Sequence, residues 1–487
     1  MKILTKSNYI LGLECPLHFW KAYNQSDKMR QPTVAEEFRY RQGEIIGDLA
    51  KRSFPEGIEV PSLEFTEDLL STRNFLRQKK PLFEAAFLHG NCYSRADILM
   101  PSGDGWDIIE VKSSTRVKDI NHHDMSFQKY VYEANGLKIN RCYVMHLNRE
   151  YVRSGEIDPV QIFVKEDITL QVNLEMEGIK ERIGELFKMM SSQELPKPGI
   201  LAGRHFTEGY HDCISEDCLG LPDNNVFKLY RGGKLSKELF EKGIVLIKDI
   251  PADVKLDAKQ NIQKECGIGG KEHVDHAKIK LFLDSLRYPI NYLDFETFST
   301  GMPMFDGLKP YSQIPFQYSL HVSHEDGKAE HHSFLYEGKD DPREEIMAGL
   351  RKSIKDSGTI LVYNQSFETA RLNELAEKFP EHKEWIEQVK KRMVDLIVPF
   401  REFSYYNPLQ QGSASIKNVF PALTGKSYDG NTIKDGDTAM AQFYNMAYGN
   451  YTDEKKEKVR EELLRYCELD TFAEMEIVKR LRELCLL

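Results

Sequence analysis

Two neighbouring apolar stretches in the first quarter of the sequence carry acidic residues and a lysine. Asp97 lies in the first stretch, and Glu110 and Lys112 end the second. Residues two apart on a strand project from the same face, so Asp97 on an adjacent strand can meet both. Two carboxylates would hold Mg²⁺, and the lysine would orient or deprotonate a water or stabilise charge on a phosphate. The structural alternative is an ion pair at a strand edge.

A helix expected over residues 126–137 brings two more polar side chains to this region. Gln128 and Tyr132 are four residues apart and share one face of that helix. We expect them to contact a water at the metal or the backbone of a nucleic acid. The order of Asp97, the Glu-x-Lys pair and the Gln-x-x-x-Tyr pair resembles the PD-(D/E)XK nuclease superfamily. Within it, the chain is similar to the RecB-like nucleases that include the CRISPR-associated iron–sulfur exonucleases.

This resemblance covers roughly residues 1–220 and implies a restriction-endonuclease-like α/β domain that cuts nucleic acid. It implies Asp97 and Glu110 as ligands of Mg²⁺ or Mn²⁺, and Lys112, Gln128 and Tyr132 as catalytic residues. Relatives often carry a histidine or an acid in a G-x-x-x-H pattern on the first helix. Gly47 stands at that position here, and Glu44 is the candidate substitute.

The same resemblance implies a metal cluster tied to cysteines. The matching positions are Cys15 near the N-terminus and Cys213 and Cys218 near residue 220, with His205 or His211 as a fourth ligand. A 4Fe–4S cluster and a Zn²⁺ ion bound by three sulfurs and one imidazole are both open. The third alternative is a decayed site whose cysteines serve as small apolar residues.

A second group of acidic residues lies in the C-terminal part of the sequence. Asp294 and Glu296 share one face of an apolar strand, where they would repel each other unless a cation lies between them. Glu368 follows at the start of a helix, and Tyr466 and Asp470 are four apart on a late helix. Two-metal phosphodiester cleavage needs such carboxylates, around two cations about 3.5–4 Å apart.

This order resembles a DEDD-type 3′–5′ exonuclease of the tyrosine variety, with a ribonuclease-H-like fold. The resemblance covers about residues 287–487 and implies metal ligation by the four acids and orientation of the attacking water by the Tyr466 hydroxyl. Glu368 stands where the family usually has aspartate, and Asp395 is a second candidate. Four residues, Gly412, Ser413, Ser415 and Lys417, are candidates for phosphate contact.

The elements that must position these residues form two α/β patterns. We expect strands at 82–89, 92–100, 106–112 and 141–147 and helices at 32–54, 126–137 and 173–190 in the first. In the second we expect strands at 289–298, 316–325, 329–337 and 359–364, helices at 342–354 and 366–379, and helix over 453–484, in one or two pieces. Residues 221–286 are expected to form a helical linker or small helical domain.

Composition narrows the class of protein. Of 487 residues, 41% are hydrophobic and 29% charged, which is typical of a globular chain. With no long apolar run and no signal peptide, we expect a cytoplasmic protein with reduced cysteines and no membrane partner. The partner we expect is nucleic acid, DNA rather than RNA, as single strands or 3′ ends. The alternative is a nucleic-acid-binding scaffold in which one or both nuclease folds are inactive.

Overall fold

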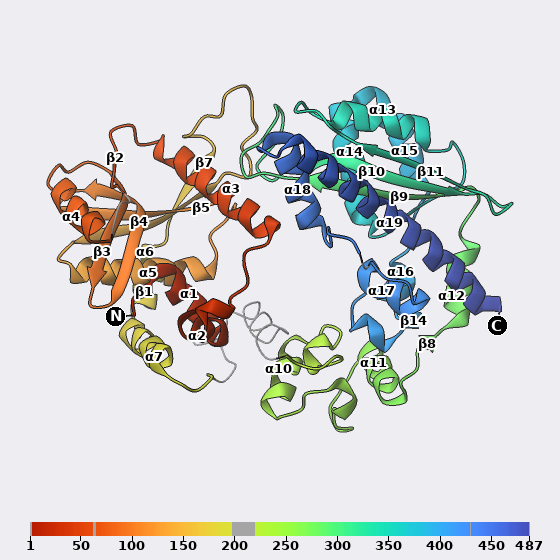
Figure 1. Ribbon diagram of the computed structural model, residues 1–487, viewed down its shortest axis with the longest axis horizontal. Helices are drawn as coiled ribbons and strands as arrows, with labels where there is room; N and C mark the ends of the chain where they lie inside the picture. Colours follow the sequence, from red (N-terminus) through yellow and green to blue (C-terminus); the bar gives the residue numbers. More distant parts are fainter. Residues whose placement is uncertain (1, 62–64, 197–219, 429, 487) are drawn as a thin grey trace. The chain divides into compact units, whose positions relative to one another are not determined.

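The computed structural model describes residues 2–61, 65–196, 220–428 and 430–486, and they form a mixed α/β protein. The chain divides into two compact units (Figure 1). The first comprises Met1–Gly220 together with Thr300–Ser312, and the second comprises Leu221–Ser299 and Gln313–Leu487. The helical region expected over residues 221–286 thus belongs to the second unit. In the described ranges, no helix combines the length and the apolarity needed to cross a membrane.

A seven-stranded sheet forms the centre of the first unit, in the order β2-β3-β4-β5-β6-β7, with the short β1 beside β4. Its strands are β1 (Leu4–Thr5), β2 (Ile58–Glu59), β3 (Leu82–His89), β4 (Cys92–Ser102), β5 (Gly105–Lys112), β6 (Ile139–Leu147) and β7 (Phe163–Asp167). The antiparallel meander expected over 82–112 is confirmed. Its first turn lies at Gly90, whose positive φ of 55° is a conformation that glycine tolerates.

Helices cover both faces of this sheet. They are α1 (Lys6–Glu14), α2 (Pro16–Asn24), α3 (Val34–Lys51), α4 (Phe65–Leu76), α5 (Asp119–Ala134), α6 (Thr169–Glu175) and α7 (Ile179–Ser191). One apolar layer joins the sheet to α1, α5 and α7, and the other joins it to α3. The single helix expected at 173–190 is wrong, because the left-handed Gly178 (φ 74°) separates α6 from α7.

The segment Thr300–Ser312 packs within the first unit. The Arg153 guanidinium donates to the carbonyls of Pro303 (2.9 Å) and Met304 (2.5 Å). The Tyr311 hydroxyl donates to the carbonyl of Ser113 (2.5 Å), the residue after Lys112. Gly301 sits so close to Ile46 that a Cβ would lie 2.4 Å from that side chain.

The second unit is built on a five-stranded sheet in the order β11-β10-β9-β12-β13. Its strands are β9 (Ile290–Phe298), β10 (Ile314–Ser323), β11 (Ala329–Leu335), β12 (Thr359–Val362) and β13 (Met393–Asp395). One face packs against α13 (Arg343–Ser353), α14 (Gln365–Lys378) and α15 (Lys383–Lys391). The other packs against α12 (His276–Asp284), α16 (Val398–Arg401), α17 (Ile416–Thr424) and α19 (Asp453–Leu486).

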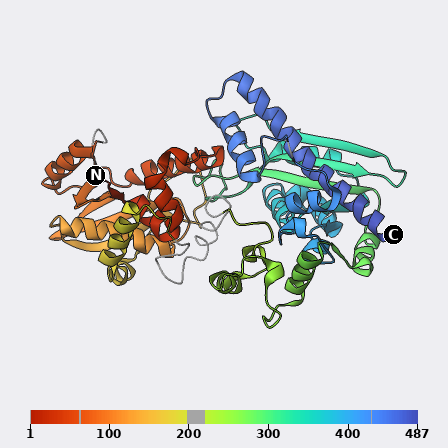
Figure 2. The ribbon, with the colours of Figure 1, turned by 60° about the horizontal axis from the view of Figure 1, so that its bottom comes forward.

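Helix α19 is a single helix of 34 residues that crosses its face of the sheet (Figures 1 and 2). Of the two forms that the sequence left open, the continuous one is correct. The remaining elements of this unit are α10 (Gly233–Glu241), α11 (Ala258–Gly269), β8 (His273–Val274), β14 (Tyr405–Tyr406) and α18 (Gly436–Tyr448). Strands β8 and β14 pair with each other, which ties part of the helical region to the rest of the second unit.

Candidate active sites

The first site lies where strands β4 and β5 stop pairing. The ladder runs up to Ile98 and Ile109, one residue short of Asp97 and Glu110. The Asp97 carboxylate accepts the hydrogen bond of the Val111 N–H instead (2.7 Å). The side chains of Asp97 and Glu110 are therefore brought together at the same point of the sheet, as the sequence predicted.

Both oxygens of Glu110 have partners. Lys6 and Lys112 each donate to Oε1 at 2.7 Å, and Gln128 donates to Oε2 at 2.7 Å. Lys112 also donates to Asp124 at 2.7 Å, and Gln128 reaches the other oxygen of Asp124 at 3.2 Å. These contacts place Lys112 and Gln128 at the site.

The charges of this site are uneven. Three carboxylates (Asp97, Glu110 and Asp124) face two ammonium groups (Lys6 and Lys112), which leaves one negative charge in excess. Burial and the charge of Glu110 raise the pKa of Asp97 to about 7. Burial also acts to raise the pKa of Glu110, but Lys112 and Lys6 outweigh it and lower that pKa to about 2. A divalent cation beside Asp97 would relieve the repulsion that raises its pKa.

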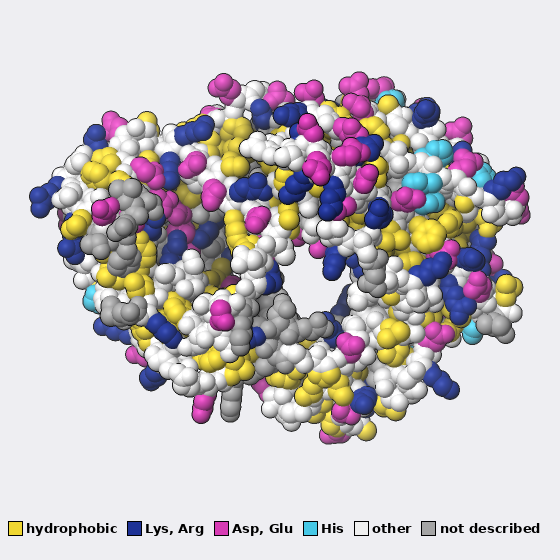
Figure 3. Space-filling view, in the orientation of Figure 1, with side chains coloured by type: hydrophobic (Ala, Val, Ile, Leu, Met, Phe, Trp, Pro, Cys, Tyr) yellow, Lys and Arg dark blue, Asp and Glu magenta, His cyan; other side chains and the backbone are white. Residues whose placement is uncertain are grey.

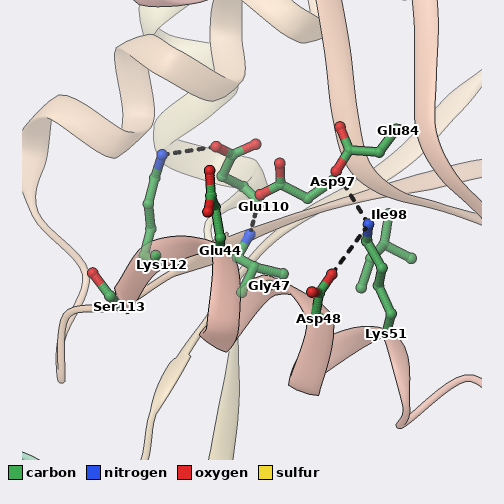
Figure 4. A pocket seen from close by; sticks show the side chains of 12 residues that line it. Glu44, Gly47, Asp48, Lys51, Glu84, Asp97, Ile98, Glu110, Lys112 and Ser113 are labelled. Carbon is green, nitrogen blue, oxygen red and sulfur yellow. Dashed lines mark hydrogen bonds and ion pairs between the residues drawn. The ribbon is translucent and has the colours of Figure 1, made fainter. Parts of the chain in front are cut away.

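Asp97, Glu110 and Lys112 line a cavity of about 570 Å³ (Figure 4). The α3 side of the cavity supplies Gly43, Glu44, Gly47, Asp48 and Lys51, and the sheet supplies Glu84, Asp97, Ile98, Glu110, Val111 and Lys112, followed by Ser113. Glu44, the candidate substitute on the first helix, is among the residues that line the cavity. Apart from its chain neighbours and the backbone of its own helix, no described atom lies within 4 Å of a Cβ added to Gly47, so the cavity is open there.

Glu84 is a further acidic residue of this cavity that sequence reasoning missed. It lies opposite Asp97, where the β3–β4 ladder skips a pair between Phe83 and Ala85. Its φ of 59° is left-handed, which is costly for a residue with a Cβ. Strain of this kind collects at functional sites, because the surrounding structure must hold it in place. Its carboxylate lies 3.5 Å from both Lys51 and Arg95.

Tyr132 and Cys15, two other predicted residues of this unit, do not line the cavity. Tyr132 is fully buried, and its hydroxyl donates to the carbonyl of Ala85 (3.3 Å) rather than facing the cavity. Cys15 is buried at the start of α2, where its sulfur accepts the His18 N–H at 3.3 Å. The remaining predicted ligands, Cys213, Cys218, His205 and the alternative His211, lie outside the described residues.

Two more residues at the first site were not predicted. Asp124 carried a weak signal, because it precedes Gln128 by four residues and therefore shares its helix face. Lys6 carried none, since it lies more than a hundred residues from Glu110 in the sequence.

The second site lies on the face of strand β9 that α19 covers. Asp294 and Glu296 project from this face, opposite Ser319 and Gln317 on β10. Cys467, on α19, places its sulfur 3.8 Å from the Asp294 carboxylate. One ligand atom from each of Asp294, Glu296 and Cys467 lies within 4.8 Å of the other two.

Two carboxylates beside this group each have a buried oxygen without a hydrogen-bond partner among the described residues. They belong to Glu368, at the start of α14, and to Glu474, one helical turn after Asp470 on α19. Glu368 is 2% exposed and Glu474 1% exposed. Buried polar atoms are rarely left unpaired, so these two oxygens fit the neighbourhood of a cation.

Asp395 shapes the loop that presents Glu368. It accepts the N–H of Asn364 (2.9 Å), the left-handed N-cap residue (φ 82°) that directly precedes α14. The structure therefore gives Asp395 a role in positioning the helix, in addition to its charge near the site.

Helix α19 contributes the tyrosine and the last aspartate. The Lys417 ammonium donates to the Tyr466 hydroxyl at 2.7 Å and lies 4.8 Å from the centre of its ring. The Tyr428 hydroxyl donates to Asp470 at 2.9 Å. Lys417 was predicted to contact phosphates, whereas Tyr428 and Glu474 were not predicted at all.

The electrostatics of the second site are dominated by buried negative charge. Burial and the neighbouring carboxylates raise the pKa of Asp294 and of Glu296 well above the usual range. Burial and the charge of Asp294 raise the pKa of Glu368 to about 9. Burial raises the pKa of Asp470 to about 6, although Lys417 opposes it. Such a cluster must hold either protons or cations at neutral pH.

Comparison with known proteins adds family information for part of the chain. Residues 291–415 match the family described as "Domain of unknown function (DUF2779)". This range includes Asp294, Glu296 and Glu368 but ends before Tyr466 and Asp470. The chain is also similar to the "Uncharacterized protein MG366 homolog" of Mycoplasma pneumoniae, with 27% identity over 220 residues. That match covers 40% of this chain and 32% of the relative, about a third of its length.

Proposed function

We propose that this protein is a metal-dependent nuclease with two catalytic sites. The N-terminal site would be of the PD-(D/E)XK type on a restriction-endonuclease-like fold, similar to RecB-like nucleases. The C-terminal site would be of the DEDD type on a ribonuclease-H-like fold, trimming 3′ ends. The observation that carries the proposal is the second site, where five buried acidic side chains lie close enough to interact electrostatically: Asp294, Glu296, Glu368, Asp470 and Glu474. The positive charge that acts on Asp294, Glu296 and Asp470 is that of Lys417.

At the first site, Asp97 and Glu110 would hold Mg²⁺ or Mn²⁺. A bound divalent ion would neutralise charge on the scissile phosphate and help to generate the nucleophile. Lys112, held between Glu110 and Asp124, would stabilise the developing negative charge or direct a water toward the phosphorus. Gln128 would hold the Glu110 carboxylate in orientation through its amide, which explains why it is buried with the acids.

At the second site, Asp294, Glu296, Glu368 and Asp470 would hold two divalent ions, which supply the same chemistry. The Tyr466 hydroxyl would accept a hydrogen bond from Lys417 and donate a hydrogen bond to the oxygen of the attacking water, which orients that water. The Tyr428 hydroxyl would keep the Asp470 carboxylate in one orientation. Glu368 would reach further than the usual aspartate by one methylene group.

The substrate we propose is nucleic acid, DNA rather than RNA, as single strands or 3′ ends. A 4Fe–4S cluster or Zn²⁺ at Cys15, Cys213, Cys218 and His205 remains a prediction, as does a cytoplasmic location.

The test is a cleavage panel on the full chain with Mg²⁺ or Mn²⁺. Substrates are single- and double-stranded DNA and RNA, labelled at the 5′ or the 3′ end. Lys112→Ala should remove one activity and Asp294→Asn a different one, and the double variant should remove both. Losses of about a hundredfold or more are expected for groups of this kind.

Matched control variants change the same residue types at exposed positions. Lys234→Ala, on α10, and Asp253→Asn should cleave like the unchanged protein. If Lys112→Ala and Asp294→Asn cleave like the controls, the assignment of both sites is wrong. If the unchanged protein binds these substrates but never cleaves them, the scaffold with inactive nuclease folds replaces the proposal.

A further inference from the structure

A group of two histidines and a glutamate lies apart from both acidic sites, on the hairpin of β10 and β11. His321 and His331 are directly opposite each other in the register of these strands, and Glu468 comes from α19 above them. One ligand atom from each of the three residues lies within 4.8 Å of the other two. Histidine side chains gather on this face of the second unit in Figure 3, beside acidic ones.

Each imidazole ring makes a hydrogen bond with a hydroxyl group through one of its nitrogens. Thr471 contacts Nδ1 of His321 at 2.8 Å, and Ser319 contacts Nε2 of His331 at 3.0 Å. The two hydroxyls lie 2.7 Å from each other, and Thr471 donates to the backbone carbonyl of Glu468 at 3.2 Å. The four polar side chains thus form one connected network that ends on a carbonyl.

The direction of this network fixes the protons on both rings. A carbonyl can only accept, so the single proton of Thr471 goes to Glu468. Thr471 must then accept from Ser319 and from Nδ1 of His321. Because Ser319 has used its only proton, it must accept from Nε2 of His331. Each imidazole therefore carries its proton on the nitrogen that faces the network, and its other nitrogen keeps a lone pair.

The remaining nitrogens are Nε2 of His321 and Nδ1 of His331. The latter lies 3.7 Å from a carboxylate oxygen of Glu468, so two acceptors face each other. Two acceptors at this distance repel each other, whereas a cation between the nitrogen and the carboxylate oxygen would be bound by both. Burial lowers the pKa of both imidazoles, to about 4 for His321, which favours the neutral rings that metals bind.

From this arrangement we infer that His321, His331 and Glu468 form a binding site for a late first-row divalent cation of the Zn²⁺ class. Two imidazoles and one carboxylate are ligands that Zn²⁺ prefers, whereas Mg²⁺ prefers oxygen alone. Hydrogen bonds from ligating histidines to groups behind them are the usual support of such sites. The two rings stack with centres 4.3 Å apart and planes 25° apart, an arrangement in which each ring keeps its hydrogen bond to a hydroxyl group.

Three protein ligands leave at least one coordination position for water or another ligand. His331 and Glu468 are exposed, which gives an ion a path from solvent, whereas His321 is 7% exposed and anchors the site. The site is also joined to the acidic cluster. Ser319 is the register partner of Asp294, and Thr471 directly follows Asp470 on α19.

The experiment measures metal binding by the full chain rather than cleavage. The protein is freed of metal with a chelator and titrated with Co²⁺ in the presence of excess Mg²⁺, which occupies sites made of oxygen alone. We expect visible absorption bands of a Co²⁺ ion with nitrogen ligands, which Zn²⁺ then displaces. His331→Gln and Glu468→Gln should each weaken binding by about tenfold or more.

His332→Gln is the matched control, because His332 is the next residue of β11 and contacts Glu330 instead. It should bind Co²⁺ like the unchanged protein. Asp294→Asn should also leave these bands intact, which separates this site from the group of Asp294, Glu296 and Cys467. The inference is overturned if the unchanged protein shows no such bands, or if the bands survive in both His331→Gln and Glu468→Gln. Either outcome is independent of the result for nuclease activity.

Discussion

Lys6 and Lys112 donate to the same carboxylate oxygen of Glu110, each at 2.7 Å. Lys112 comes from the same strand as Glu110, whereas Lys6 comes from the first turn of α1. Two ammonium groups on one oxygen supply the positive charge that a divalent cation would otherwise provide. A divalent cation bound beside Glu110 would therefore replace the positive charge that is lost when Lys6 is substituted.

Lys6→Met should destabilise the protein in chelator by about 1–3 kcal/mol, because it leaves buried Glu110 with less positive charge. Mg²⁺ or Mn²⁺ should restore part of this loss, so metal should raise the melting temperature more in the variant than in the unchanged protein. Thermal unfolding with and without metal measures this difference. The control is Lys180→Met, at an exposed position of α7. An equal response to metal in Lys6→Met and the control would contradict the prediction.

Substitutions of Glu84 can separate the effect of its left-handed backbone on stability from the effect of its carboxylate on cleavage. Its left-handed backbone favours glycine, so Glu84→Gly should fold within about 1 kcal/mol of the unchanged protein, and Glu84→Ala should be about 1 kcal/mol less stable than Glu84→Gly. Both variants remove the carboxylate from the cavity, so both should weaken cleavage at the first site. Chemical denaturation and a cleavage assay measure the two effects. If Glu84→Ala proves as stable as Glu84→Gly, the strain assigned to this position is absent.

Asp294→Asn should stabilise the protein in chelator, by about 1–2 kcal/mol at pH 8, while removing activity at the second site. The reason is that Asp294 is crowded by other buried carboxylates when no cation is present. Thermal unfolding in chelator and in Mg²⁺ provides the measurement. Asp253→Asn, on the surface, should change neither the stability nor its dependence on metal. A loss of stability in Asp294→Asn would count against a repulsive cluster.

Stability in chelator should fall as the pH rises from about 6.5 to 8.5. The pKa of Glu368 is raised to about 9 and that of Asp97 to about 7, so the folded state holds protons that the unfolded state has already lost. Unfolding then becomes easier with rising pH. His321 has the opposite sign but acts below this window, because its pKa is lowered from about 6.5 to about 4 and its contribution is lost only as the pH falls.

Melting temperatures between pH 6.5 and 8.5, in chelator and in Mg²⁺, show whether stability falls or rises with pH. Glu368→Gln should flatten the fall in chelator, and Mg²⁺ should flatten it in the unchanged protein, because a cation replaces the protons. Stability that rises with pH between 6.5 and 8.5 would show that other groups dominate.

Arg153 holds the segment Thr300–Ser312 by its backbone, through the carbonyls of Pro303 and Met304. Arg153→Ala should therefore speed proteolytic cleavage within this segment, because local opening becomes easier when these bonds are lost. Limited proteolysis followed by mass spectrometry identifies the cleaved bonds. Arg141→Ala removes an arginine of the same unit that makes an exposed ion pair with Asp167, and it should leave the cleavage rate unchanged.

Much of the secondary structure could be predicted because its signals are local. Strand β3 was predicted at its observed bounds, since a nearly continuous apolar run and the turn at Gly90 mark it. The prediction for 173–190 failed because the apolar spacing continues across the break between the two helices, where α6 ends at Glu175 and the left-handed Gly178 is the N-cap of α7. Helices α1 and α2 were not predicted, and the apolar residues of α1 follow no single helical face that could mark it.

The sequence by itself determined the chemistry available at each site. Glu110 and Lys112 share a face because strand periodicity is two, and Tyr466 and Asp470 share a face because helix periodicity is close to four. Tertiary structure alone decided which distant groups join them, such as Lys6 at Glu110 and Lys417 at Tyr466. Periodicity acts over a few residues, whereas Lys6 and Glu110 are separated by 104 positions and Lys417 and Tyr466 by 49. Each pair meets only when the unit that contains it packs its own core and brings the two elements together.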